Sequence, residues 1–175
     1  MNKTLEEVVK ENEALKEKII TYEKMIDELS APIIPSILPE TILVPLTGTL
    51  TERRIFRIQD EITKRVSGDR ANTVLIDFTG ISAFEVEDGL GYQYLGERLS
   101  ALVSTLSLMG VNTIFVGFTP QFAQKLILTN APAFRETKSF STFRRGLQYL
   151  LSQQNLQLVE IDEEALLATS QKGKP

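Results

Sequence analysis

The chain has 175 residues, of which 42% are hydrophobic, and its formal net charge at pH 7 is −4, as is typical of a globular domain with a short appendage. The sequence contains no histidine, cysteine or tryptophan. This excludes Ser-His-Asp and Cys-His nucleophilic centres, zinc-finger and thiolate metal sites, and disulfides. We therefore expect binding or scaffolding, with no catalytic residue, no metal and no cofactor.

Charge and hydropathy also bear on the partners and the compartment. No stretch is basic enough to follow a phosphate backbone, so we expect no nucleic-acid partner. No apolar run approaches the roughly 20 residues of a membrane span. The N-terminus is acidic and lacks the apolar core of a signal peptide. We expect a cytoplasmic protein that does not contact a membrane.

The first thirty residues carry a heptad pattern. Asn12 is the one polar residue in the core positions of this pattern, and such an asparagine fixes register and two-strandedness in parallel coiled coils. Glu11 faces Lys16 of a partner helix, and Lys18 faces Glu23, so the charges favour a parallel homodimer. The alternative is a single amphipathic helix that packs on the body of the protein. The core positions, three and four residues apart, are Leu5, Val8, Asn12, Leu15, Ile19, Tyr22, Ile26 and Leu29.

Residues 31–151 alternate between strand and helix patterns. This alternation predicts an α/β fold with a mostly parallel sheet. Apolar segments predict strands at 42–46, 73–78, 113–118 and 137–140, after a proline-rich edge segment at 32–39. Helical periodicity predicts helices at 51–66, 87–109, 120–128 and 142–151. We expect residues 152–175 to form a flexible tail, with a short helical patch around residues 163–168.

An acidic cluster follows the second buried strand. Asp77 ends the strand, and Glu85, Glu87 and Asp88 precede the long helix. Carboxylates gathered in this way could hold Mg²⁺ or act as acid and base. The favoured interpretation is that they stabilise a helix N-terminus through its dipole. A carboxylate-dependent enzyme or a small-ligand module remains the minor alternative.

Several ordered segments resemble one family. They are Ser-Ala-Pro-Ile-Ile-Pro at 30–35, the segments at 42–53 and 75–80, Phe-Thr-Pro-Gln-Phe-Ala-Gln at 118–124, and Ser-Phe-Ser-Thr-Phe at 139–143. Together they resemble the STAS domain of RsbR-type stressosome proteins, which are related to anti-sigma-factor antagonists. The resemblance covers residues 30–151. It implies a STAS fold at 31–151, preceded by the coiled-coil helix at 1–30.

The resemblance also implies a function. It implies a non-enzymatic scaffold that assembles with paralogous STAS proteins and captures a switch serine/threonine kinase in bacterial stress signalling. The alternative is a stand-alone anti-sigma-factor antagonist that binds a single kinase. The implied partner-binding surface consists of Asp77, Thr79, Ser82, Glu85, Glu87 and Asp88.

The sequence departs from the family at the phosphorylated positions. The two places that carry a phosphorylated hydroxyl in RsbR-type proteins fall on Val86 and Lys125, neither of which accepts phosphate on a hydroxyl. Glu85, Glu87 and Asp88 supply fixed negative charge near the first place. The hypothesis is a member that does not respond to phosphorylation.

Overall fold

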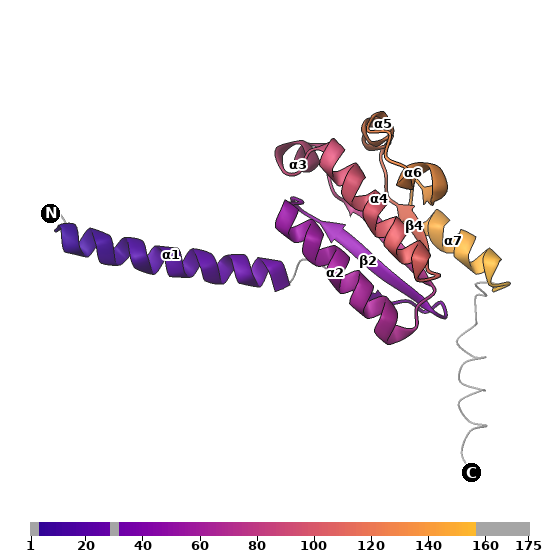
Figure 1. Ribbon diagram of the computed structural model, residues 1–175, viewed down its shortest axis with the longest axis horizontal. Coiled ribbons are helices and arrows are strands. Elements are labelled where there is room, and N and C mark those ends of the chain that lie inside the picture. Colours follow the sequence, from indigo (N-terminus) through magenta and orange to yellow (C-terminus); the bar gives the residue numbers. More distant parts are fainter. Residues whose placement is uncertain (1–3, 29–31, 157–175) are drawn as a thin grey trace, which may run out of the picture.

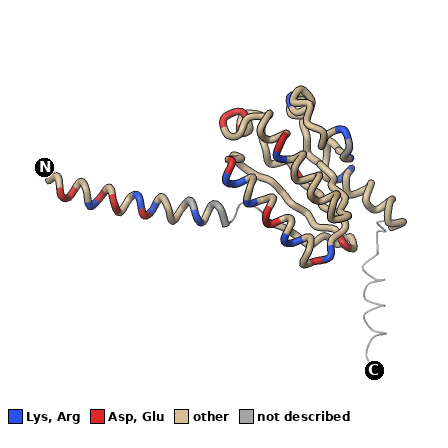
Figure 2. The backbone as a smooth tube through the Cα atoms, in the orientation of Figure 1, with Lys and Arg blue, Asp and Glu red and all other residues tan. Residues whose placement is uncertain are grey.

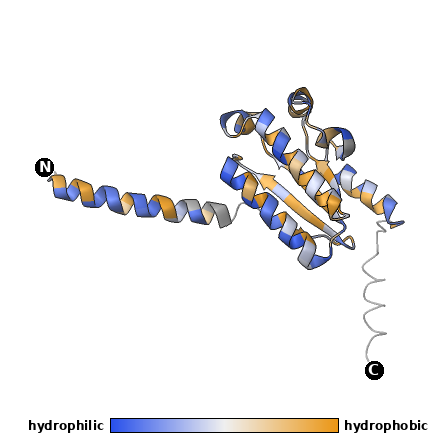
Figure 3. Ribbon diagram, viewed as in Figure 1, coloured by the Kyte–Doolittle hydropathy of each residue, from blue (hydrophilic) through white to orange (hydrophobic). Residues whose placement is uncertain are grey.

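The computed structural model describes residues 4–28 and 32–156 of the chain. The first helix, α1 (Leu5–Glu28), extends away from the body of the protein (Figure 1). Apolar and polar residues alternate along it (Figure 3), and each of its described side chains is exposed. Leu29 and the side chain of Ile26 lie outside the described part of the chain. The helix predicted at the N-terminus is present, and the described residues of its apolar row are not covered by any other described part of the chain.

The described part of the body contains one five-stranded sheet with the strands in sequence order. The edge strand β1 runs antiparallel to β2, and β2 to β5 run parallel to one another. This confirms the mostly parallel sheet and the edge strand expected in the proline-rich segment. The strands are β1 (Ile34–Pro35), β2 (Thr41–Thr47), β3 (Thr73–Gly80), β4 (Asn112–Val116) and β5 (Lys138–Phe140).

The connections between the parallel strands lie on one face of the sheet. Crossovers between parallel strands are right-handed, so strands that advance in one direction place every connecting helix on the same face. The main core forms between that face and the helices, and it includes Val44, Phe78 and Leu99. The connecting helices are α2 (Glu52–Asp69), α3 (Ala83–Asp88), α4 (Tyr92–Leu108), α5 (Pro120–Leu128) and α6 (Ala133–Glu136).

The last helix in the described part of the chain, α7 (Phe143–Gln153), packs on the other face of the sheet. It packs against β3, β4 and β5. Its Leu150 and Leu151 form a second, smaller core with Leu75, Ile114 and other residues of that face. A parallel sheet needs apolar cover on both faces, and α7 provides it on this one.

Two helix boundaries differ from the sequence prediction. The helix expected at 87–109 is two helices, because Gly91 has a φ of +75° and the backbone of Gly89 lies too close to Leu50 for a side chain. A helix cannot continue through such a left-handed position. The helix expected to end near Val66 continues through Gly68 to Asp69, and Arg70 ends it with a φ of 53°. The short helix α6 was not predicted.

A pair of glycine substitutions tests the packing at the carboxyl end of β4. Gly117 has a φ of +84°, and a Cβ there would lie 2.7 Å from Oδ1 of Asp77. We expect Gly117→Ala to lower the free energy of unfolding by about 1–3 kcal/mol through backbone strain and overlap. Urea denaturation monitored by circular dichroism measures this change in the free energy of unfolding.

The matched control is Gly68→Ala in α2. No atom lies within 4 Å of a Cβ at Gly68, and its backbone is helical. We expect this substitution to raise stability by about 0.5–1 kcal/mol, since alanine loses less entropy than glycine in a helix. Equal effects of the two substitutions would contradict the account of Gly117.

Candidate functional site

The carboxyl ends of the parallel strands meet at one edge of the sheet, where four helices begin. Threonine or serine caps each of these helices by accepting a hydrogen bond from a backbone N–H in the first turn. The capping residues are Thr51 of α2, Ser82 of α3, Thr119 of α5 and Thr142 of α7. The fold therefore brings segments that are far apart in the sequence to a single surface. We call the part of this surface where α3 and α5 lie next to each other the α3–α5 edge.

Asp77 and Thr79 form a local turn at the end of β3. Oδ1 of Asp77 accepts hydrogen bonds from the backbone N–H of Thr79 at 2.8 Å and from its hydroxyl at 2.5 Å. Asp77 is half-buried and Thr79 is exposed. The carboxylate of Asp77 thus shapes the turn that leads into α3.

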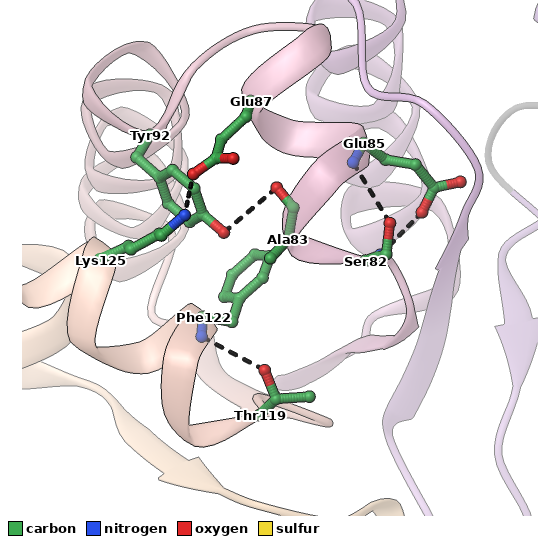
Figure 4. Close-up of polar contacts among 8 residues, drawn as sticks. All are labelled: Ser82, Ala83, Glu85, Glu87, Tyr92, Thr119, Phe122 and Lys125. Atoms are coloured by element: carbon green, nitrogen blue, oxygen red, sulfur yellow. Dashed lines mark hydrogen bonds and ion pairs between the residues drawn. The ribbon is translucent and has the colours of Figure 1, made fainter.

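Ser82 and Glu85 form a capping box at the start of α3 (Figure 4). The Ser82 hydroxyl accepts from the Glu85 N–H at 3.2 Å, and the Glu85 carboxylate accepts from the Ser82 N–H at 2.7 Å. Hydrogen bonding from Ser82 to the Glu85 carboxylate, first from its backbone N–H and then from its side chain, lowers the pKa of Glu85. The capping box is therefore formed at neutral pH and is lost as the pH falls through that lowered pKa.

Glu87 of α3 forms an ion pair with Lys125 of α5 (Figure 4). The Lys125 ammonium also lies 5.3 Å from the ring centroid of Tyr92, at the start of α4. The Tyr92 hydroxyl lies 3.5 Å from the carbonyl oxygen of Ala83, and burial raises the pKa of this phenol. Lys125 of α5 therefore contacts both α3, through Glu87, and α4, through Tyr92.

The structure separates the two positions that the family resemblance marks. Val86 is fully buried in the main core, whereas the Lys125 side chain is 40% exposed and paired. Asp88 and Glu87 are exposed. Among residues 4–28 and 32–156, no three acidic side chains come together as a group that could hold a metal ion.

Sequence reasoning missed two features of this edge. Phe84 is 72% exposed on α3, among the residues of the expected partner-binding surface. The Glu87–Lys125 pair joins residues 38 positions apart, so only the folded chain reveals it. The sequence signal for an exposed Phe84 was its position between the capping residues Ser82 and Glu85, in the first turn of a short helix.

The charges of the body are dispersed over its helices and loops (Figure 2). In the described part of the chain, none of the helices combines the length and apolar character that crossing a membrane requires.

The chain is similar to proteins of known name. No protein-family model matches it. The RsbT co-antagonist protein RsbRA of Bacillus subtilis is 25% identical over 148 residues, which are 84% of this chain and 51% of the relative. The chain therefore spans about half the length of that curated relative.

Solved structures share the fold. A variant of RsbS from Moorella thermoacetica superimposes with a TM-score of 0.57 at 16% identity, over 72% of this chain and 98% of that chain. A chain from the structure titled "Molecular architecture of the stressosome, a signal integration and transduction hub" gives a TM-score of 0.55 at 14% identity, over 71% of this chain and all of that chain. The fold of these structures, and the relatives named as RsbR co-antagonist proteins, agree with the resemblance of the sequence to STAS-domain proteins of the RsbR type.

Proposed function

We propose that this chain is a non-enzymatic scaffold and regulator of a bacterial stress-signalling complex of the stressosome kind. In this role it dimerises through α1 and binds paralogous STAS proteins and a switch serine/threonine kinase. The observation that carries the proposal is the attachment of a STAS body to a helix whose described apolar heptad residues are all exposed. An isolated helix with such a row is marginal in water, so a partner helix is required.

The names of the relatives support the choice of partners. RsbRA is named as a co-antagonist of RsbT, and a chain of similar fold belongs to a stressosome. The α3–α5 edge offers what a protein partner uses: the exposed aromatic ring of Phe84 with charged side chains around it. Exposed aromatic residues are frequent energetic centres of interfaces.

We further propose that the α3–α5 edge works without phosphorylation. Val86 is buried and carries no hydroxyl, and Lys125 carries a positive charge that Glu87 already neutralises. A phosphate would add about −1.5 to −2 charge at such a position and would create new ion pairs. Here the Glu87–Lys125 pair links α3 to α5 without a phosphate, and in this proposal the edge keeps one state.

The first test concerns dimerisation. We expect light scattering during size-exclusion chromatography to give twice the chain mass of 19.6 kDa, or a larger multiple, for the natural sequence. Leu15→Glu places a charge in the middle of the heptad row and should abolish the α1 contact. Glu13→Gln, outside the row, is the matched control and should keep the natural mass. A monomer for the natural sequence, or the same mass for all three proteins, would contradict the coiled coil.

The register residue gives an independent check. Asn12→Ile removes the polar core residue, and we expect a more stable α1 assembly with loss of strict two-strandedness. We compare the mass distribution and the melting temperature of a peptide of residues 1–30 with those of the same peptide carrying Asn12→Ile. An unchanged distribution and unchanged melting temperature would show that Asn12 does not lie in a helix interface.

The second test concerns phosphorylation. We incubate the chain with a switch kinase and ATP and measure intact mass, with a paralogous STAS protein that the kinase phosphorylates as the positive control. We expect no stoichiometric phosphate on this chain, because the hydroxyls of Thr79 and Ser82 are engaged in the turn and the cap of α3. Stoichiometric phosphate on either residue would overturn the proposal.

The third test concerns kinase binding. Phe84→Ala removes the exposed ring of the α3–α5 edge, and we expect at least about tenfold weaker kinase binding, as for an interface hot spot. Phe56→Ala is the control, because Phe56 is similarly exposed, at 64%, but lies on α2. Isothermal titration calorimetry compares the two. Equal affinities of both variants and the natural chain would place the kinase elsewhere.

A further inference from the structure

The face of the sheet that α7 covers remains partly open over β1 and β2. Residues of β2 that point to the main core are almost fully buried, at 2% for Ile42 and 0% for Val44. On the opposite face, Leu43 and Pro45 of the same strand are only half-buried. Ile34 of β1 pairs with Leu43, so it shares that face, and it is 46% exposed. We call Ile34, Leu43 and Pro45 the open strip.

The topology explains why this strip is open. All the crossover helices lie on the main-core face, because the parallel strands advance in one direction. Among the helices that the structure describes, α7 alone packs on the other face, where it contacts β3, β4 and β5. The open strip is therefore the part of this face that the described chain has no crossover helix to cover.

The chain leaves α7 beside this strip. The Gln154 side-chain amide donates to the carbonyl oxygen of Pro39 at 3.2 Å, immediately before β2. Asn155 has a φ of 54°, and the Leu156 N–H donates to the carbonyl oxygen of Leu151 at 2.9 Å, which reverses the chain direction at the end of the helix. The described part of the chain thus ends next to the start of β2.

The sequence that follows has the composition to cover the strip. Residues 157–167 include Leu158, Val159, Ile161, Leu166 and Leu167. Between them lie four acidic residues at 160 and 162–164. The helix α7, whose last turn contacts Pro39 before β2, carries the exposed Arg144 and Arg145 in its first turn and no acidic residue, so its charge is opposite to that of the following segment.

We propose that residues 157–168 dock on the open strip of the same chain, with their apolar side chains against Ile34, Leu43 and Pro45 and their acidic residues toward the arginines of α7. Nineteen residues follow Leu156, and β2 is seven residues long, so the segment is long enough to cross the strip in either an extended or a helical conformation. The docked segment supplies the apolar cover that a parallel sheet requires on both faces.

Cysteine cross-linking tests the proposal in the full chain, since the natural sequence has no cysteine. We place one cysteine on the strip with Ile34→Cys and one in the segment, with Ile161→Cys or Leu166→Cys, and add a short bismaleimide. The control replaces the strip cysteine by Leu108→Cys, which lies at the exposed end of α4 in the helical layer of the opposite face. We expect a severalfold higher intramolecular yield with the strip cysteine than with the control for at least one segment position.

Two results would overturn the proposal. Equal yields with Ile34→Cys and Leu108→Cys for both segment positions would show a freely moving tail. Cross-links between chains in an equimolar mixture of the single-cysteine variants, at the yield of the double variant, would show that a second copy covers the strip. In the double-cysteine variant that carries Ile34→Cys, we expect the combined substitutions Glu163→Lys and Glu164→Lys to lower the cross-linking yield severalfold. We expect Lys172→Glu to leave this yield unchanged. An unchanged yield in the first of these would remove the charge argument.

Discussion

The strand order of the sheet, combined with the right-handedness of parallel crossovers, determines most of this structure. Because β2 to β5 follow one another across the sheet, α2 to α6 are confined to one face. The same order brings the carboxyl ends of the strands, and the caps of α2, α3, α5 and α7, to a single edge. The α3–α5 edge and the open strip on the other face are both consequences of this one constraint.

At the α3–α5 edge, short-range interactions hold the surface that we propose as the partner-binding surface. The capping box of Ser82 and Glu85 holds the start of α3, and Glu87 joins its end to Lys125 of α5. Exposed ion pairs of this kind contribute little to global stability. Their effect is local, since they hold Phe84 and the acidic residues in a fixed arrangement. In the proposed function, this arrangement takes the place of a phosphorylation switch.

The sequence was sufficient for features that depend on local pattern. The heptad spacing predicted α1, Thr51 predicted the start of α2, and the apolar segments predicted the parallel strands. It was insufficient where the folded backbone and its packing decide: the positive φ of Gly91 separates α3 from α4, and the burial of Val86 follows from how α3 packs. The Glu87–Lys125 pair required the fold itself, because no local pattern links the two residues.

We propose that this chain is an assembly component that binds STAS proteins and a kinase. Co-expression of the full chain with a paralogous STAS protein and a switch kinase, followed by imaging of the purified particles, tests it most directly. We expect a large particle that contains all three proteins. Isolated dimers of this chain, with neither the paralogue nor the kinase retained, would contradict it.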